Sequence, residues 1–239
     1  FLLALTNAAQ VNSNSDDGEG SLRQVISDSE EGDTITFSDS FTITLVSPIT
    51  INKDIVIDGG DKVTISGGEE TTIFKITSGN VEIKNITLRD GLSKGADGRR
   101  QGRWVEHAPG GGGAGMGGAI AIQSGNVVID DVSFVNNKAI GGNGSNSSPT
   151  GNLDYAGGGG SSIFGGGARN TEWGRNDGRA GGFGGGGAGG LEYGDSGKRN
   201  GNGGKGGFGG GGGGGAGGTY SCSGWPHYIS CLLYTSDAA

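Results

Sequence analysis

Histidine, cysteine and proline are scarce in this chain. Its 239 residues include 2 histidines, 2 cysteines and 4 prolines. The histidines, His107 and His227, are too few for a multi-histidine zinc site, and they make a His-based catalytic triad hard to build. The cysteines, Cys222 and Cys231, lie 231 − 222 = 9 positions apart and could close one small loop in an oxidising compartment.

The chain also lacks an excess of basic residues and any apolar run long enough to cross a membrane. Its formal net charge is −8, whereas a protein that binds duplex nucleic acid needs a basic face. Residues 1–94 hold 15 acidic and 7 basic side chains, so the 10 acidic and 10 basic side chains of 95–239 cancel. We therefore expect no nucleic-acid partner and no transmembrane segment.

Glycine, by contrast, is far more abundant than in an ordinary domain. The chain has 58 glycines, concentrated from about Gly110 onward, and only 31% hydrophobic residues. No strict Gly-x-y period is present, which excludes collagen. Stretches such as 181–190 fit loose phosphate-loop patterns but lack the Gly-Lys-Ser/Thr ending and the strand-to-helix context of a nucleotide site. We expect no cofactor and no metal ion.

Residues 34–88 contain a rapid series of short strand patterns. Each pattern is rich in Ile, Val, Thr and Phe, and polar turns with glycine separate them. None of the turns is long enough for a crossover helix, which excludes a doubly wound sheet and leaves a sandwich, a barrel or a solenoid. The predicted strands are 34–37, 41–45, 49–51, 55–57, 63–65, 73–76, 81–83 and 86–88.

One strand-turn-strand sequence occurs twice, at 79–91 and 125–137. In both copies Gly-Asn precedes two stretches with apolar residues at alternate positions, the pattern of a strand with one buried face. The offset is constant, since 127 − 81 = 46. Such a repeat favours a solenoid whose turns of about 20–25 residues carry three short strands. The residues predicted to build its core are Ile55, Ile57, Val81, Ile83, Ile86, Leu88, Val127, Ile129, Val132 and Phe134.

A short amphipathic helix is predicted before the first of these strands. Ser21 can cap it, and Gln24 follows three residues later, as a capping box requires. Leu22, Val25 and Ile26 fall on one helical face. We expect this helix to cover the open end of the strand stack, whose first layer otherwise leaves backbone groups unpaired.

Five stretches can be compared with a known family: 21–26 (SLRQVI), 32–37 (GDTITF), 55–59 (IVIDG), 117–120 (GGAI) and 134–139 (FVNNKA). Together they resemble bacterial-type β-helix surface proteins. The group includes autotransporter passengers and polymorphic outer-membrane proteins, and pectin-lyase-like folds share its architecture. The resemblance covers about residues 11–140. It implies an all-β chain folded as a right-handed parallel β-helix. The repeat offset of 46 equals about two turns of the solenoid, which places a glycine-rich insertion at about 92–117.

The second glycine-rich segment, 141–218, admits two interpretations. Glycine loses the most conformational freedom on folding, so the segment can be flexible and solvated. Alternatively, it forms a bundle of polyglycine-type left-handed strands that pack closely because they lack side chains. Aromatic residues spaced along the segment would then seal its layers. The aromatic residues are Phe164, Trp173, Phe183, Tyr193 and Phe208.

The first insertion carries the candidate glycan contacts. Arginine and tryptophan side chains bind sugars by ion pairing and stacking, although a solvated loop explains them equally well. The candidates are Arg99, Arg100, Arg103 and Trp104. Asn146, and less favourably Asn85, fit the N-glycosylation pattern if the source is a eukaryote.

The resemblance leaves function open, because the β-helix fold hosts both enzymes and adhesins. We expect a non-catalytic secreted or cell-surface protein, adhesin-like or structural, with a glycan or surface receptor as partner. The alternative is a polysaccharide lyase or hydrolase acting on acidic glycans, which needs carboxylates and a basic residue on one face. Turn formation is the simpler role for the available carboxylates, so no catalytic residue is assigned. These residues are Asp58, Asp90 beside Arg89, Asp130 and Asp131.

The two ends of the sequence are interpreted separately. Residues 1–10 resemble the remnant of a secretory signal with cleavage near Ala8 or Ala9, and a first apolar strand is the alternative. Residues 219–239 form a tail. Within it, 231–239 resemble a translated sequencing-adapter read-through, which would remove Cys231 from any disulfide.

Overall fold

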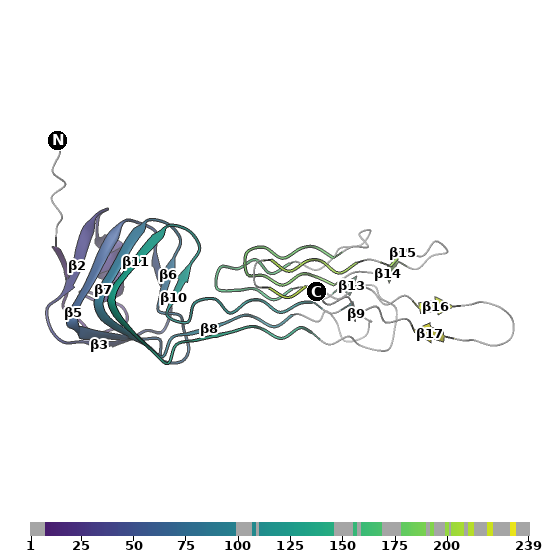
Figure 1. Cartoon of the computed structure of the whole chain (residues 1–239), viewed down its shortest axis with the longest axis horizontal. Helices are drawn as coiled ribbons and strands as arrows, with labels where there is room; N and C mark the ends of the chain where they lie inside the picture. Colours follow the sequence, from purple (N-terminus) through teal and green to yellow (C-terminus); the bar gives the residue numbers. More distant parts are fainter. Residues whose placement is uncertain are drawn as a thin grey trace, which may run out of the picture. The chain divides into compact units, whose positions relative to one another are not determined.

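The chain contains two compact units in the computed structural model (Figure 1). The strand unit comprises Phe1–Ser93 and Gly117–Ala139, and the glycine unit comprises Lys94–Met116 and Ile140–Ala239. The structure describes residues 8–98, 107–108, 110–145, 155–156, 159–168, 178–189, 192–193, 199–200, 202–207, 210–212, 219–221 and 230–232.

The strand unit is built from parallel β-strands and one helix, which confirms the prediction of an all-β chain. Its larger sheet has the order β1-β2-β5-β7-β11 with β3 beside β5, a second sheet has the order β10-β6-β4, and β8 pairs with β12. All pairings within the two larger sheets are parallel. The elements are β1 (Ala8–Val11), α1 (Leu22–Asp28), β2 (Asp33–Phe37), β3 (Thr42–Thr44), β4 (Ile49–Ile51), β5 (Ile55–Ser66), β6 (Phe74–Ile76), β7 (Asn80–Arg89), β8 (Leu92–Lys94), β10 (Ile120–Ile122), β11 (Asn126–Val135) and β12 (Lys138–Ile140).

The two larger sheets advance together along the chain. Val81 lies opposite Ile55 on one side and Val127 on the other. Phe74 in the second sheet likewise lies between Ile49 and Ile120. The chain therefore crosses from one sheet to the other and returns one layer further on. The strands predicted at 55–57 and 63–65 are one strand, β5, with a register shift between Asp58 and Val63.

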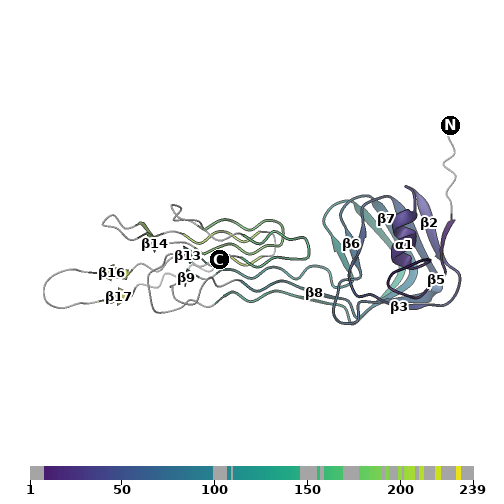
Figure 2. The same ribbon diagram turned by 180° about the vertical axis from the view of Figure 1, so that it is seen from behind.

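Helix α1 begins where the sequence predicts it. The Ser21 hydroxyl oxygen accepts a hydrogen bond from the Gln24 backbone N–H at 3.2 Å. The Gln24 side chain donates to Asp28 rather than returning to Ser21, so only half of the capping box forms. Leu22 and Ile26 are buried, and α1 contacts β1 (Figure 2). The helix thus adds apolar side chains to the core next to the first strand.

The ten predicted core residues differ in burial according to their layer. The six residues in β5 and β7 are all buried. In β11, Val127 and Val132 are half-buried, whereas Ile129 and Phe134 are 41% and 50% exposed. Because β11 is the last strand of its sheet, these side chains pack against a layer on one side only.

The glycine unit contains only short strands among its described residues. β9 and β13 are parallel, whereas β14 with β15 and β16 with β17 are antiparallel. The strands are β9 (His107–Ala108), β13 (Tyr155–Ala156), β14 (Glu192–Tyr193), β15 (Arg199–Asn200), β16 (Thr219–Ser221) and β17 (Ser230–Leu232). Apart from Lys94 at the end of β8 and Ile140 at the end of β12, its other described residues belong to neither a helix nor a named strand.

Candidate functional site

Amide and carboxylate side chains form a column at the start of β5, β7 and β11, with one residue from each layer. The Asn80 backbone N–H donates to Asp54 Oδ1 at 2.8 Å, and Asn80 Nδ2 donates to Asp54 Oδ2 at 2.9 Å. One layer further, Asn126 Nδ2 donates to Asn80 Oδ1 at 2.9 Å. The two bonds from Asn80 lower the pKa of the Asp54 carboxyl, the side-chain bond having the larger effect. The repeated Gly-Asn dipeptides therefore connect successive layers.

A second column lies at the corner that follows the same strands. Asn136 Nδ2 donates to Asp90 Oδ1 at 2.9 Å and to Glu69 Oε1 at 3.2 Å. Arg89 Nε lies 2.6 Å from Asp90 Oδ2. The bond from Asn136, followed by that from Arg89, lowers the pKa of Asp90. Asn137 adds to this corner by accepting from the Gly91 N–H at 2.7 Å.

Asp58 and Asn85 form a third contact between layers. Asp58 Oδ1 accepts from the Gly60 N–H at 3.0 Å and from Asn85 Nδ2 at 2.9 Å. Asn85 is half-buried and has a left-handed backbone, with φ of 51°. Its amide nitrogen is thus already bonded within the fold, which makes Asn85 a poor acceptor for a glycan.

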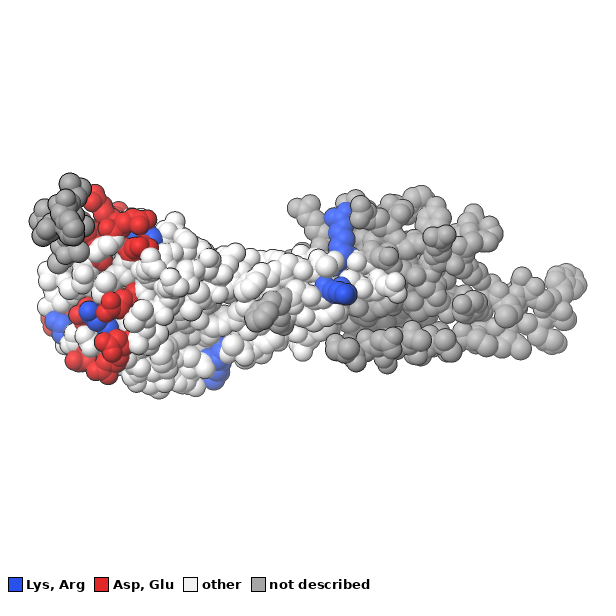
Figure 3. Space-filling model, turned by 45° about the horizontal axis from the view of Figure 1, so that its top comes forward, with Lys and Arg blue, Asp and Glu red and all other residues white. Residues whose placement is uncertain are grey.

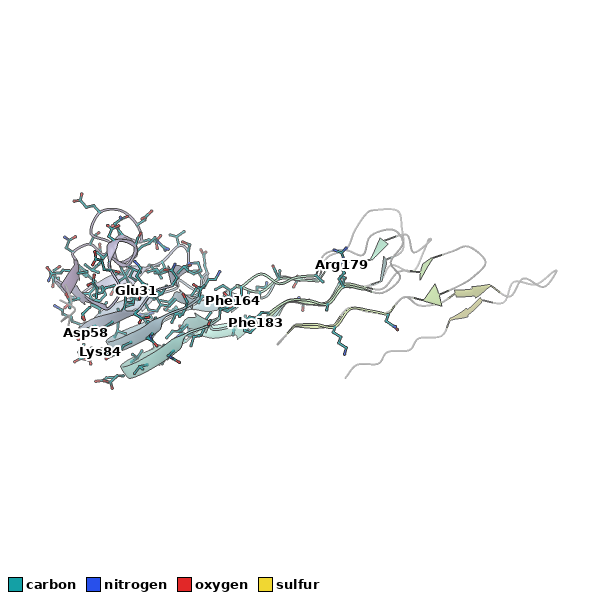
Figure 4. All side chains as sticks on the ribbon, turned by 90° about the horizontal axis from the view of Figure 1, so that it is seen from above. Glu31, Asp58, Lys84, Phe164, Arg179 and Phe183 are labelled. Carbon is teal, nitrogen blue, oxygen red and sulfur yellow. The ribbon has the colours of Figure 1, made fainter. Side chains whose placement is uncertain are left out.

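A row of alternating charge crosses the outside of the larger sheet. Lys84 lies in register between Asp58 and Asp130, and Lys84 Nζ is 3.1 Å from Glu82 Oε1. The hydrogen bond and charge of Glu82 raise the pKa of Lys84, with smaller effects from Asp58 and Asp130. Figure 4 labels Asp58 and Lys84 on this row, and Figure 3 shows the acidic side chains gathered on the strand unit.

Two of the carboxylates considered for polysaccharide cleavage, Asp58 and Asp90, hold turns and layers together. Asp58 and Asp90 both accept bonds from asparagines of the next layer. A general acid needs a raised pKa, whereas the pKa of Asp90 is lowered. Within the described part of the chain, no group of three or more His, Cys, Asp or Glu side chains could hold a metal ion.

Two segments, 110–114 and 184–189, form the inside of the glycine unit. Every residue in both segments is buried. They run antiparallel and are joined by two backbone hydrogen bonds, from Gly111 N–H to Gly187 O at 2.9 Å and from Ala114 N–H to Gly184 O at 2.7 Å. Both the donors and the acceptors are three residues apart. Hydrogen bonds to one neighbour therefore recur with a period of three.

The same period appears toward a second neighbour, segment 202–207. There the carbonyls of Gly185 and Ala188 accept from Gly207 and Gly204, at 2.8 Å and 2.7 Å. A β-strand would show a period of two, because its donors and acceptors alternate between two sides. A period of three is that of a polyproline II-type helix, which has three residues per turn and no internal hydrogen bonds.

Segment 184–189 bonds to six neighbouring stretches of backbone, two of which, around Gly160 and around Ala168, belong to 159–168. Beyond 110–114 and 202–207 it reaches four more, each by a backbone hydrogen bond of 2.8–3.0 Å. The bonds are Gly186 N–H to Gly160 O, Ala168 N–H to Gly186 O, Gly187 N–H to Gly211 O and Ala188 N–H to Arg179 O. The described part of the glycine tract is thus a packed bundle and not a solvated chain.

The bundle requires glycine because its backbones touch. A Cβ on Gly185 would overlap Gly166 O, and one on Gly186 would overlap Gly111 O. At the edge of the bundle, Phe164 and Phe183 contact each other edge to face, with ring centroids 5.7 Å apart (Figure 4). Sequence reasoning raised this bundle only as one of two interpretations, because backbone partners leave no side-chain pattern.

Several predicted residues lie outside the described residues. The glycan candidates Arg99, Arg100, Arg103 and Trp104 are among them, as are Asn146, Cys222 and His227. Cys231 belongs to β17, and Ala8 and Ala9 belong to β1.

Comparisons of the chain with protein-family models, with curated proteins and with solved structures found no match. Among the described residues, no helix has the length and apolar character needed to cross a membrane.

Proposed function

We propose that this chain is a non-catalytic secreted or cell-surface protein, adhesin-like or structural, in which a right-handed parallel β-helix presents the glycine unit. The parallel, in-register layers of the strand unit support a β-helix. The bacterial-type surface proteins that residues 11–140 resemble are the source of the secreted or surface location.

The observation that carries this proposal is the bundle around segment 184–189. Its six neighbours are joined by backbone groups, and its inner residues are glycine and alanine. A bundle built in this way exposes isolated side chains, such as Phe183 and Lys205, instead of the clustered acids and bases that bond cleavage requires. Presentation of a rigid surface is the role that this arrangement supports best.

Adhesion of protein-coated beads to immobilised pectin, alginate, cellulose and collagen tests the proposal. We expect retention on at least one of these surfaces by the wild type, and its loss in Gly185→Ala, whose added methyl group would overlap Gly166 O. Gly141→Ala is the matched control, because the nearest atom to its new Cβ is 3.9 Å away.

The same preparations are assayed for unsaturated or reducing-end products from polygalacturonate and alginate. We expect none. If the wild type forms such products and Asp130→Asn does not, the enzyme alternative is established. If Gly185→Ala adheres as well as the wild type, the bundle is not needed for adhesion and the proposal is wrong.

A further inference from the structure

The strand unit ends in an apolar layer that no described residue covers. This terminal layer, residues 120–137, contains β10 and β11, each the last strand of its sheet. Ile122, Ile129 and Phe134 are 45%, 41% and 50% exposed. Their register partners one layer earlier, in β6 and β7, are buried. The inward side chains of the terminal layer thus lack the second neighbour that every earlier layer has.

The other end of the stack differs, because α1 packs there. Leu22 and Ile26 of α1 are buried, and α1 contacts β1, the first strand of the larger sheet. A second copy of the chain could not add its terminal layer to this end without displacing α1. Head-to-tail association is therefore disfavoured.

The terminal layer specifies the pattern of a strand that would cover it. A parallel strand on the free edge of β11 would pair with its backbone groups and place apolar residues over four inward positions. Those positions are Val127, Ile129, Val132 and Phe134. The alternating row Asp58, Lys84, Asp130 would continue with Lys or Arg. The column Asp54, Asn80, Asn126 would continue with another Asn or Asp.

We propose that the terminal layer is a docking surface for a polypeptide that adds one more parallel layer with this pattern. Residues 73–91 of the chain itself provide an example. Each paired residue of 74–90 corresponds to the residue 46 positions later in 120–136. A peptide copy of 74–90 placed on β11 in the same register would therefore bring Lys84 over Asp130 and Ile83 over Ile129. Main-chain hydrogen bonds would supply the affinity. The row of inward apolar residues and the row of alternating charge would supply the specificity.

A second copy joined by a twofold axis fits the terminal layer less well. Antiparallel pairing of β11 with itself keeps apolar residues together if Val127 faces Phe134 and Ile129 faces Val132. That register brings Asp130 and Asp131 of both copies to one place, which gathers four carboxylates. Like charges directly opposite on paired strands are destabilising, so a partner with a cation opposite Asp130 is favoured.

A titration of the full chain against a fluorescein-labelled peptide of residues 73–91, followed by anisotropy, tests the proposal. We expect saturable binding below about 1 mM. Ile129→Asp should weaken binding about tenfold or more, because it puts a charge in an inward row. Val46→Asp is the control: Val46 is 78% exposed and lies outside the terminal layer, so it should bind like the wild type.

A charge exchange makes the test specific. Asp130→Lys should weaken the peptide about fivefold, and the peptide carrying Lys84→Glu should restore that loss, in line with the modest strength of exposed pairs. The new lysine would lie opposite Lys84, but the cost of an exposed like-charge pair is modest and Asp130 is exposed, so this variant is expected to keep the fold, as circular dichroism would verify.

Three results would overturn the proposal. They are the absence of saturable binding, equal binding by Ile129→Asp and wild type, or a dimer in sedimentation equilibrium that Ile129→Asp abolishes and the peptide does not displace. The last result would assign the surface to a second copy.

Discussion

Asp90 and Asn136 each combine a left-handed backbone conformation with a side-chain hydrogen bond between layers. Their φ angles are 51° and 54°, and their side chains bond at 2.9 Å. Asn85 and Asp131, at 51° and 47°, occupy another corner of the same layers. Asn and Asp tolerate this conformation better than other residues with side chains. The corners therefore select Asn and Asp for their backbone as well as for their bonds.

Asp90→Asn should change how stability depends on pH. The bonds from Asn136 and Arg89 lower the pKa of Asp90 in the folded state. The stability that the ionised Asp90 carboxylate contributes is therefore complete above the unfolded-state pKa of about 3.9. It is lost as the pH falls through the lower pKa of Asp90 in the folded state. Urea unfolding should show the wild type more stable than Asp90→Asn at pH 7 (a difference that shrinks as the pH falls from about 3.9 through the lowered pKa of Asp90).

Asp61→Asn is the control for this prediction. Asp61 also has a positive φ, of 59°, and no described residue donates to its carboxylate. A difference between wild type and Asp90→Asn that stays constant from pH 7 to pH 2 would contradict the assignment.

At the scale of elements, strand and glycine segments are specified in different ways. Each strand layer is aligned by inward side chains and by polar columns such as Asp54, Asn80 and Asn126. The inner glycine segments, 110–114 and 184–189, are aligned by N–H and C=O groups that recur every three residues. The packing of the bundle depends on the absence of side chains, because its backbones touch.

Gly185→Ala should destabilise the bundle by about 1–3 kcal/mol or more, the usual effect of overpacking. Its Cβ would overlap Gly166 O, whereas the Cβ of Gly141→Ala would meet Gly113 O at 3.9 Å, an ordinary van der Waals contact, so that variant should change stability by less than about 1 kcal/mol. Hydrogen exchange of the 184–188 amides measures the difference. Unprotected amides in the wild-type segment would contradict the packed bundle.

Side-chain patterns account for what could be predicted. Alternating Ile, Val and Leu located β2, β5 and β7, and Ser21 with the apolar face of Leu22 and Ile26 located α1. The exposure of Ile129 and Phe134 could not be predicted, because a repeat shows which face points inward but not which layer is last. The sequence predicts the bundle only as one of two interpretations, since any glycine can pair with any other.

On the scale of the whole molecule, two units rest on different interactions. The strand unit has a continuous core that includes Ile35, Ile57 and Phe74, all 0% exposed. The described segments of the glycine unit are joined by backbone hydrogen bonds, each worth about 0.5–1.5 kcal/mol net.

We expect the two units to unfold in separate steps. Ile57→Ala should lower the stability of the strand unit by about 2–5 kcal/mol through a core cavity, and Gly185→Ala should act on the glycine unit. Hydrogen exchange followed by mass spectrometry assigns each change to its unit. Equal loss of protection in both units from either variant would show a single cooperative transition.

The small number of apolar side chains inside the bundle has a thermal consequence. Unfolding raises the heat capacity in proportion to the apolar surface exposed, and exposure of peptide groups lowers it. Segments 110–114 and 184–189 bury backbone with only Ala114 and Ala188 as side chains. The free energy of unfolding of the glycine unit should therefore vary almost linearly with temperature and keep rising on cooling. The strand unit should pass through a maximum, so the two parts of the chain are most stable at different temperatures.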